Sequence, residues 1–466
     1  MEHHKTIILG AGVTGLSIAK SLLSKGENDL IILEKNDFVG GLCSSTEKNG
    51  FTIDFGPHKL FSLIPGMMDE FKEINGEDNL VVKKVNSLFF LGKKFQFPIN
   101  PVELAKNISP KTVSAGVQIP LSLAKSLIVY NLLRKKDDSF KDYLMKGFGK
   151  KAYQILFEGY AWKVWADPDT LSKDIAKIRI PIPNISDLIK KTFNKKSQPS
   201  INASEFYYPK HGMRQFTKKM AEIIKQNKGE ILLNQNLISI TKKADNFVIK
   251  TDKTEFSCNN LVSTIPLNSL INLYDFSTAE IKKTSAKLRY NDLSLIYLFF
   301  DQPKIITDNW IFFPEKEYSF NRLSEQKSFS PYTVPKDKTV LCAEITNPKF
   351  NSLSDQEMLS RVIADLIKAK IINNHKDKKI FDQQVLRFKN IYPIYDLDYK
   401  KNLNKVLAFL DQNGIITIGR YGLFNYNNID HCFDMGKPIA EHLAANNSPA
   451  DWIQARKKFD DYKIVD

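Results

Sequence analysis

The first 34 residues combine two short apolar runs with one amphipathic stretch. Residues 6–9 (TIIL) are typical of a buried strand, and apolar side chains then recur at helical spacing over residues 16–23. A second apolar run, residues 30–33, ends in Glu34. This order predicts a βαβ unit with parallel strands.

The pattern changes twice along the rest of the chain. Between about residues 67 and 200 the periodicity is mainly helical, most clearly at 140–160, and Pro181 and Pro183 interrupt it. Helices are also expected at 355–370 and 437–445. From residue 230 onward, short alternating or apolar runs predict strands at 231–233, 237–241, 247–251, 255–256, 261–265, 293–300, 310–313, 340–345 and 414–419.

Together these patterns predict an α/β protein in which a Rossmann-type domain carries an inserted helical region and is joined by a second, sheet-based domain. We assign residues 1–75, 205–266 and 405–446 to the discontinuous Rossmann-type domain. Residues 76–204 form the helical substrate region, 267–404 the sheet-based substrate domain and 447–466 a C-terminal tail.

The composition supports a globular protein and excludes a disordered chain, because 42% of the 466 residues are hydrophobic and 26% are charged. No uncharged apolar run reaches the roughly 18 residues that a membrane-spanning helix needs. The nearest candidate, residues 117–133, is interrupted by Gln118, Pro120 and Lys125 and followed by a basic triplet at 134–136. We interpret it as a helix packed inside the protein, with a membrane-docking helix as the alternative. We therefore expect no integral membrane association.

The distribution of charge and the spacing of the cysteines argue against further classes of protein. The net charge of +15 suggests an anionic partner, but the lysines are spread along the whole chain, so nucleic-acid binding is not expected. The four cysteines contain no CxxC pair, so their spacing predicts neither a metal site nor a disulfide framework. Residues 1–5 lack the pattern of a signal peptide, which predicts residence in the cytoplasm.

A glycine motif lies between the first predicted strand and helix. Gly10, Gly12 and Gly15 have the spacing GxGxxG, which permits a tight turn, close approach of a pyrophosphate and close helix packing. The N–H groups near Val13 and Thr14 would then face the phosphates at the positive end of the helix dipole. Glu34 would accept hydrogen bonds from the ribose hydroxyls of an adenosine. The alternative is a tight turn with a solvated glutamate.

Further motifs follow in order: Gly40, Gly41 and Leu42, then DFGPH at 54–58, then Gly419 and Arg420, then Asp430. This set resembles the FAD-binding amine oxidase superfamily, in which a second glycine pair also approaches the pyrophosphate. The resemblance implies FAD rather than NAD, bound by Gly10, Gly12, Val13, Thr14, Gly15, Glu34, Gly40, Gly41, Leu42, Gly419, Arg420 and Asp430.

Within that superfamily the chain is similar to the UDP-galactopyranose mutase family, especially its eukaryotic-type branch, from about residue 7 to residue 436. The shared segments are 54–61 (DFGPHKLF), 163–166 (KVWA), 179–184 (RIPIPN), 261–264 (LVST) and 419–422 (GRYG). In that family reduced flavin attacks the anomeric carbon of the sugar while the nucleoside diphosphate leaves, with no net redox change. Such chemistry needs cations on the diphosphate more than a protein nucleophile.

The resemblance implies roles for individual residues. Arg179 and Arg322 match arginines that hold the diphosphate, a task that suits a planar and permanently charged guanidinium. The chain has only nine arginines, so an arginine at both positions is informative, although surface salt bridges are an alternative. His58 matches the histidine beside the flavin, or it is a histidine satisfied in a turn. The substrate-site matches, any of which could instead be core residues, are Phe61, Tyr160, Trp310, Tyr392 and Tyr426.

The sequence also departs from the family. Phe312 and Phe329 replace tyrosines of the substrate pocket, Ala161 replaces an asparagine and Leu156 replaces an aromatic residue. The loop at 209–212 beside the flavin is also reduced. We therefore expect a nucleotide-sugar mutase whose substrate is dTDP-fucopyranose or UDP-galactopyranose, with an external electron donor and a role in surface polysaccharide synthesis. The alternatives are an oxidoreductase of the amine oxidase or protoporphyrinogen oxidase type, and a flavoprotein that binds a partner without chemistry.

Overall fold

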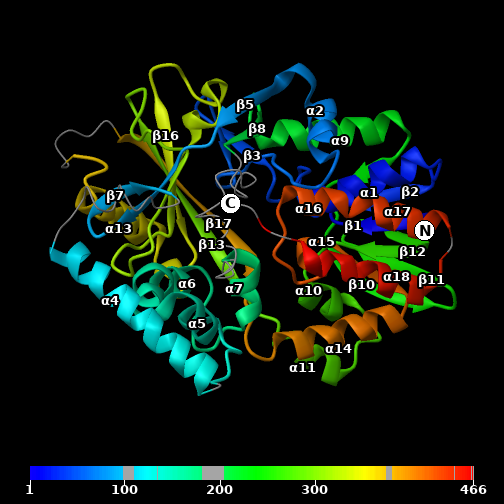
Figure 1. Cartoon of the computed structure of the whole chain (residues 1–466). Helices are drawn as coiled ribbons and strands as arrows, with labels where there is room; N and C mark the ends of the chain where they lie inside the picture. Colours follow the sequence, from blue (N-terminus) through cyan, green and yellow to red (C-terminus); the bar gives the residue numbers. More distant parts are fainter. Residues whose placement is uncertain are drawn as a thin grey trace. The chain divides into compact units, whose positions relative to one another are not determined.

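The computed structural model describes residues 1–97, 110–133, 135–180, 204–373, 380–445, 447–462 and 464, so Pro181 and Pro183 lie outside the described residues. The chain divides into two compact units (Figure 1). The first unit comprises Met1–Val81, Tyr207–Arg289 and Tyr399–Ile464, and the second comprises Val82–Phe206 and Tyr290–Asp398. Residues 267–289, which we had assigned to the sheet-based domain, thus belong to the first unit, where α11 (Ala279–Ser285) packs against α14 (Tyr399–Gln412).

The first unit is built on a seven-stranded sheet of order β10-β11-β12-β1-β2-β9, in which β18 also pairs with β12. β1, β2, β9, β12 and β18 are parallel, whereas β10 and β11 add antiparallel strands. The predicted parallel βαβ unit is therefore confirmed. The strands of this sheet are β1 (Glu2–Leu9), β2 (Leu30–Leu33), β9 (Glu230–Leu232), β10 (Leu237–Lys243), β11 (Asn246–Thr251), β12 (Glu255–Ser263) and β18 (Ile415–Thr417).

Helices and one hairpin surround this sheet. The central strands are apolar on both faces, and every residue of β2 is buried, as expected for parallel strands covered by helices. α1 packs against α9, α16 and α17. The remaining elements are α1 (Val13–Ser24), β3 (Ser45–Lys48), β4 (Phe51–Asp54), α2 (Met67–Asn75), α9 (Met213–Gln226), α10 (Leu267–Leu273), α15 (Gly419–Gly422), α16 (Ile429–Asp434), α17 (Gly436–Ala444) and α18 (Pro449–Arg456).

The second unit contains another seven-stranded sheet, of order β17-β13-β16-β15-β14-β6-β7, in which only β14 and β6 pair in parallel. Its strands are β6 (Asn86–Phe90), β7 (Lys93–Gln96), β13 (Tyr290–Phe300), β14 (Trp310–Phe312), β15 (Arg322–Glu325), β16 (Thr339–Ile345) and β17 (Ile380–Pro393). Its helices are α4 (Pro110–Leu127), α5 (Phe140–Ala152), α6 (Glu158–Val164), α7 (Lys173–Arg179), α12 (Pro348–Asn351) and α13 (Asp355–Lys368). Two of the unit boundaries fall inside strands, one in β5 (Asn79–Lys83) and one in β8 (Glu205–Pro209).

Four strands of this sheet were not predicted: β6, β7, β15 and β17, of which β15 has only four residues, too few to show a clear alternation. β6 and β7 lie in the region that we expected to be mainly helical, and they form a hairpin whose turn residues Leu91 and Gly92 both have positive φ, at 52° and 74°. β17 was missed because its lysine, arginine and acidic residues conceal the alternation of a long edge strand.

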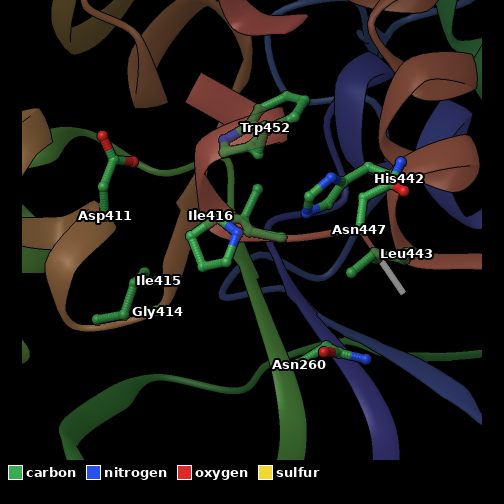
Figure 2. A pocket seen from close by; sticks show the side chains of 10 residues that line it. Asn260, Asp411, Gly414, Ile415, Ile416, His442, Leu443, Asn447 and Trp452 are labelled. Atoms are coloured by element: carbon green, nitrogen blue, oxygen red, sulfur yellow. The ribbon is translucent and has the colours of Figure 1, made fainter. Parts of the chain in front are cut away.

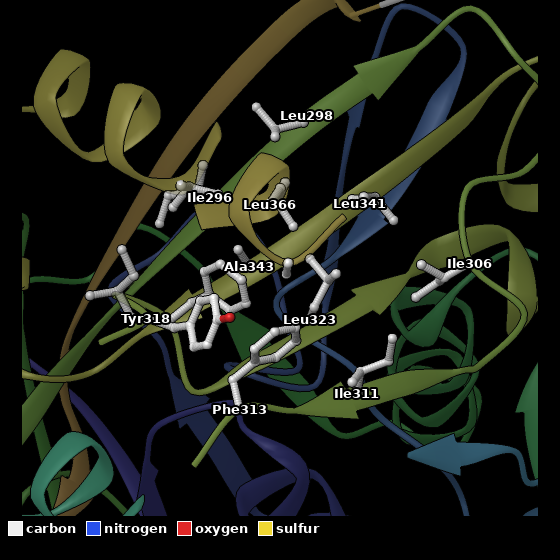
Figure 3. Close-up of a cluster of buried hydrophobic side chains, with 14 of the residues drawn as sticks. Ile296, Leu298, Ile306, Ile311, Phe313, Tyr318, Leu323, Leu341, Ala343 and Leu366 are labelled. Atoms are coloured by element: carbon white, nitrogen blue, oxygen red, sulfur yellow. The ribbon is translucent and has the colours of Figure 1, made fainter. Parts of the chain in front are cut away.

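The two faces of this sheet differ in chemistry. One face is apolar and packs against α13, with Ile296, Leu323 and Ala343 in its core (Figure 3). The opposite face follows from the strand register, because side chains alternate and directly paired residues share a face. Phe312 pairs with Arg322, and Arg322 pairs with Glu344, so an aromatic ring, a cation and an anion lie in a row on the second face.

The helical region differs from the expectation in one respect. Residues 117–133 were expected to pack inside the protein. α4 does pack against α5, but the side chains of Leu121, Ile128 and Leu133 are exposed. The reason is that this segment carries apolar side chains on two sides, and among the described residues its neighbouring helix α5 covers one of them. No helix among the described residues is long and apolar enough to cross a membrane.

Candidate functional site

The glycine motif of the first unit connects the end of β1 to the start of α1. Gly12 is the N-cap of α1, no side chain caps this end, and the first turn has no acidic residue. The N–H groups that begin a helix lack partners within the helix and carry the positive end of its dipole. This helix end can therefore receive an anionic group.

The three glycines have different surroundings. Gly10 has a φ of +99°, and a Cβ atom there would lie 2.6 Å from Oγ1 of Thr264. A Cβ atom on Gly15 would lie 2.0 Å from the carbonyl oxygen of Gly10, so this position allows no side chain. A Cβ atom on Gly12 would meet no protein atom within 4 Å. The space at Gly12 is thus open toward a ligand. Gly10 permits the tight turn, and Gly15 permits the close packing of the helix against this turn.

Glu34 lies at the end of β2 and is buried. Its Oε2 accepts a hydrogen bond from the backbone N–H of Ala11 at 2.8 Å, which ties it to the glycine motif. Its Oε1 accepts from the backbone and side-chain nitrogens of Asn36, at 2.9 and 2.7 Å. Because a carboxylate offers about four acceptor positions, one remains for a further donor such as a ribose hydroxyl.

The second glycine pair lies directly beside the first motif. The N–H of Gly40 donates to the carbonyl of Ala11 at 2.7 Å, and Gly40 forms a parallel bridge with Gly12. Gly41, with a φ of +57°, approaches the same residue, because a Cβ atom on it would lie 3.5 Å from Cα of Gly12. Leu42 follows and is half-buried. These contacts bring both glycine segments, far apart in sequence, to one place.

The C-terminal part of the first unit reaches the same helix start. A Cβ atom on Gly419 would lie 2.9 Å from Oγ1 of Thr14. Arg420 donates to the carbonyl of Asn427 at 2.9 Å, and its guanidinium lies 5.3 Å from the ring centre of Tyr426. Tyr426, which we had placed in the substrate site, is buried beside this arginine.

Asp430 is the clearest polar feature of this part. It is 5% exposed and lies in the first turn of α16. Its Oδ2 accepts a hydrogen bond from the Ser62 hydroxyl at 2.7 Å, whereas its buried Oδ1 has no hydrogen-bond partner among the described residues. Since buried carboxylate oxygens are normally hydrogen-bonded, Oδ1 is suited to accept from a bound molecule.

The loop after β4 carries His58 and Phe61. His58 Nε2 lies 3.2 Å from the carbonyl oxygen of Phe55, and Phe61 is half-buried with the ammonium of Lys59 5.7 Å from its ring centre. The loop begins at Asp54, whose buried carboxylate accepts from Ser45, Tyr208 and the N–H of Met213. Ser62 then connects the loop to Asp430.

These observations fit a dinucleotide cofactor. The uncapped helix start and the open space at Gly12 suit a pyrophosphate, the remaining acceptor position on Glu34 suits a ribose, and Oδ1 of Asp430 suits a hydroxyl or amide donor. A separate cavity of about 240 Å³ in this unit is lined by other residues, including Asn260, His442 and Trp452 (Figure 2). It lies where β18 begins, whereas Gly419 follows its end, so it is not part of the cofactor site.

In the second unit, Arg322 is the centre of the candidate site. Its guanidinium makes a two-pronged ion pair with Glu344, through Nε to Oε1 and through Nη2 to Oε2 at 2.9 Å. Burial by itself lowers the pKa of Arg322, but Glu344 and the nearby Tyr392 and Tyr160 raise it above its ordinary value. Arg322 therefore stays charged and is held in a fixed orientation.

Aromatic residues surround this ion pair. Tyr160 meets the ring of Phe312 edge to face, with ring centres 6.1 Å apart. Tyr392 lies on β17, where it pairs with Asn291. Trp310 is two residues before Phe312 and stacks on Phe329. The structure thus brings together Tyr160, Arg322 and Tyr392, with Trp310 on the same face of the sheet.

Arg179 lies on a helix of the second unit. It is the last residue of α7 and is half-buried. The motif that it begins, RIPIPN at 179–184, lies outside the described residues from position 181 onward.

Sequence reasoning missed two residues that organise this site. Glu344 is the charged residue in an otherwise apolar strand (VLCAEI, 340–345), and that contrast could have marked it. Lys163 is buried, and its ammonium donates to the carbonyls of Phe313 and Phe320 at 2.8 and 3.0 Å. It therefore holds the two ends of the loop that connects β14 and β15. Burial lowers its pKa to about 7.

The sequence and fold define the class of protein. A model of the flavin containing amine oxidoreductase family matches residues 13–385, and the chain belongs to this family of flavoproteins. The predicted membership in the amine oxidase superfamily is thereby confirmed.

Individual relatives include both a mutase and an oxidase. A crystal structure of reduced UDP-galactopyranose mutase superposes with a TM-score of 0.82 at 20% identity, covering 97% of each chain. The UDP-galactopyranose mutase of Mycoplasma genitalium is 22% identical over 74% of this chain and 80% of its own. The coproporphyrinogen III oxidase of Staphylococcus aureus is 22% identical over 94% of this chain and 98% of its own. The fold is therefore similar to that of the mutase, while identity is equally low to both activities.

Proposed function

We propose that this protein is a flavin-dependent nucleotide-sugar mutase that converts an NDP-hexopyranose to its furanose form. The observation that carries the proposal is Arg322, a permanently charged guanidinium oriented by Glu344 and flanked by Tyr160 and Tyr392 on the polar face of the second sheet. A leaving diphosphate needs such a fixed cation, because negative charge develops on it as its bond to the sugar breaks. An amine substrate does not need one, whereas a porphyrinogen carries carboxylates that an arginine also binds, so the product analysis below separates these two cases.

We assign FAD to the first unit. The start of α1 at Gly12, Val13 and Thr14 holds the pyrophosphate, with the second glycine pair beside it. Glu34 accepts from the ribose, and Asp430 accepts from the flavin half of the cofactor. Bound reduced flavin supplies a nucleophilic nitrogen without net redox change, so the electron donor is needed only to keep the flavin reduced.

The protein's own residues bind and orient the substrate. Arg322 and Arg179 hold the diphosphate, Tyr160 and Tyr392 donate to it through their hydroxyls, and Trp310 lies beside the sugar. His58 fixes the loop next to the flavin through its contact with the carbonyl of Phe55.

The apolar substitutions favour a less hydroxylated substrate. Phe312 and Ala161 are buried, and neither side chain can pair with a hydroxyl. A hydroxyl that enters such a pocket loses its hydrogen bonds with water and finds no replacement. We therefore propose a deoxy nucleotide sugar such as dTDP-fucopyranose, with UDP-galactopyranose as the second candidate.

One observation favours an oxidoreductase as the second candidate function. The alignment with the coproporphyrinogen III oxidase covers 94% of this chain, whereas the alignment with the Mycoplasma genitalium mutase covers 74%. Such an enzyme would share the whole cofactor site, and Arg322 would then bind a carboxylate of the porphyrinogen instead of a diphosphate.

Product analysis separates the two functions. The purified protein is reduced with dithionite and given dTDP-fucopyranose, UDP-galactopyranose and UDP-glucose in separate reactions, and the products are resolved by anion-exchange chromatography and NMR. We expect furanose product from the reduced enzyme alone, without stoichiometric use of the reductant. Equal conversion by oxidised enzyme, or steady peroxide formation with a porphyrinogen or amine, would support the oxidoreductase. A higher kcat/KM for UDP-galactopyranose would refute the deoxy-sugar assignment but leave the mutase intact.

A further inference from the structure

The outward face of α4 is apolar and exposed. Leu121, Ile128 and, just after the helix, Leu133 are 67%, 55% and 69% exposed. Leu121 and Ile128 are seven residues apart, and the exposed Ala124 lies between them on the same side of the helix. Figure 1 shows α5 and α6 on one side of α4. Large apolar side chains gathered on one exposed helix face are a mark of a binding surface.

The inward face of α4 packs closely against α5. A Cβ atom on Gly149 of α5 would lie 2.8 Å from Cα of Leu123, so the two helices touch closely. The N–H of Lys151 donates to the Ser122 hydroxyl at 3.1 Å. The outward leucine and isoleucine therefore cannot turn inward, because the space is already filled.

Lysines border this apolar face. Lys125 lies on α4 four residues after Leu121 and three before Ile128, and Lys136 lies three residues after Leu133. Both are exposed, and neither has an acidic partner in the part of the chain that the structure describes. The nearby carboxylates are already paired, Asp142 with Lys135 and Asp137 with Lys146 and Lys173. The border thus carries uncompensated positive charge.

We infer that α4 docks this protein on the surface of an anionic lipid bilayer. An amphipathic helix with an apolar face and a lysine border lies in the membrane interface, with its apolar side chains between the acyl chains and its lysines at the headgroups. Its 18 residues span about 27 Å, enough to lie along the surface. The inference is independent of the proposed function.

Charge argues against a second copy as the occupant. In a symmetric contact the same patch meets itself, so the lysines of both copies would lie close together, while the carboxylates nearby, including the exposed Asp138, are already paired with Lys173 and other lysines. An anionic lipid surface instead supplies the opposite charge.

The test is sedimentation of the full-length holoenzyme with vesicles of phosphatidylcholine, with or without phosphatidylglycerol. We expect binding only to the vesicles that contain phosphatidylglycerol, and weaker binding as salt is added. The variant L121Q/I128Q should lower the partition coefficient at least about tenfold. The matched control L397Q/I238Q changes the same residue types at exposed positions elsewhere and should have no effect.

A second pair of variants tests the lysine border. K125Q/K136Q should lower the partition coefficient about fivefold for each lysine. The control K282Q/K283Q removes two exposed lysines from α11 and should change it little. Bound flavin, read from its absorbance, reports that each variant is folded.

Three results would overturn the inference. The first is no binding to phosphatidylglycerol vesicles. The second is binding that L121Q/I128Q and L397Q/I238Q reduce equally, which would mean that α4 is not the docking face. The third is a dimer in analytical ultracentrifugation that L121Q/I128Q converts to monomer, which would show that this face covers a second copy of the chain.

Discussion

The mostly parallel sheet of the first unit and the antiparallel sheet of the second unit hold their candidate ligand groups in different ways. In the first unit the groups gather where parallel strands end, and they include the backbone N–H groups at the uncapped start of α1, where Gly12 leaves the space open. In the second unit they are side chains on one face of a sheet, assembled across β14, β15 and β16. We therefore expect the site of the first unit to lose its ligand when a side-chain atom is added at a glycine. The site of the second unit should lose its ligand when a charged side chain is removed.

The largest effects should come from added atoms at the glycine motif. Gly15→Ala places a Cβ atom 2.0 Å from the carbonyl of Gly10, and we expect it to lower the free energy of unfolding by about 3 kcal/mol or more. Gly12→Val meets no protein atom at its Cβ, so we expect it to fold and yet lose almost all flavin. Denaturant titration and flavin absorbance distinguish these outcomes. Full flavin occupancy in Gly12→Val would mean that the phosphate lies elsewhere.

Removal of charge in the second unit comes next. Arg322→Ala should remove about 1.5 to 3 kcal/mol of transition-state stabilisation, which lowers kcat/KM of the reduced enzyme about 10- to 150-fold. The flavin content should stay unchanged. Arg179→Ala should act in the same direction.

Arg322→Ala also leaves the buried Glu344 unpaired, which should lower the free energy of unfolding by about 3 to 5 kcal/mol. The matched variant R322M/E344L removes both charges and should recover most of that stability but none of the activity. Recovery of activity in R322M/E344L would show that neither charge contacts the substrate.

The comparison also explains what could be predicted from sequence. The βαβ unit and its glycines are local, because Gly10, Gly12, Gly15 and Glu34 lie within 25 residues, so the motif itself describes the geometry. The resemblance to known families added the remote Gly419 and Asp430. Glu344 and Lys163 could not be found in the same way, because their roles depend on strand register and on which carbonyls a loop presents. The exposure of Leu121 and Ile128 was missed because periodicity alone does not show which face of a helix finds a partner.

A smaller effect, on the pH dependence of the free energy of unfolding, is expected from replacement of Lys163, which holds the loop before Arg322. Its pKa in the folded protein is about 7 and that of an ordinary lysine is 10.5, so between these values the unfolded chain binds more protons. The free energy of unfolding of the native protein should therefore gain a contribution that rises with pH from 7 toward 10. The variant Lys163→Met lacks this pH-dependent contribution, because methionine does not bind a proton. The difference between the two proteins should grow by up to about 1.4 kcal/mol per pH unit.

Denaturant titrations at pH 6.5, 8 and 9.5 measure this difference. Lys177→Met, at an exposed lysine of α7, is the control and should run parallel to the native protein. If the free energy of unfolding of Lys163→Met has the same pH dependence as that of the native protein, then burial does not lower the pKa of Lys163 in the folded protein.

The smallest effect should be at Glu34, where a side chain takes part in the backbone-rich site of the first unit. Glu34→Gln keeps one oxygen acceptor but turns an amide toward either the N–H of Ala11 or the two donors of Asn36, and donors cannot pair with each other. The loss of one such hydrogen bond costs about 0.5 to 1.5 kcal/mol, so flavin affinity should fall roughly two- to tenfold, far less than in Gly12→Val. Equilibrium titration of the apoprotein with FAD measures this, with the exposed Glu230→Gln as the unchanged control. A loss in Glu34→Gln as complete as in Gly12→Val would mean that this side chain, and not the backbone of the glycine segments, dominates cofactor binding, and the contrast between the two units would no longer hold.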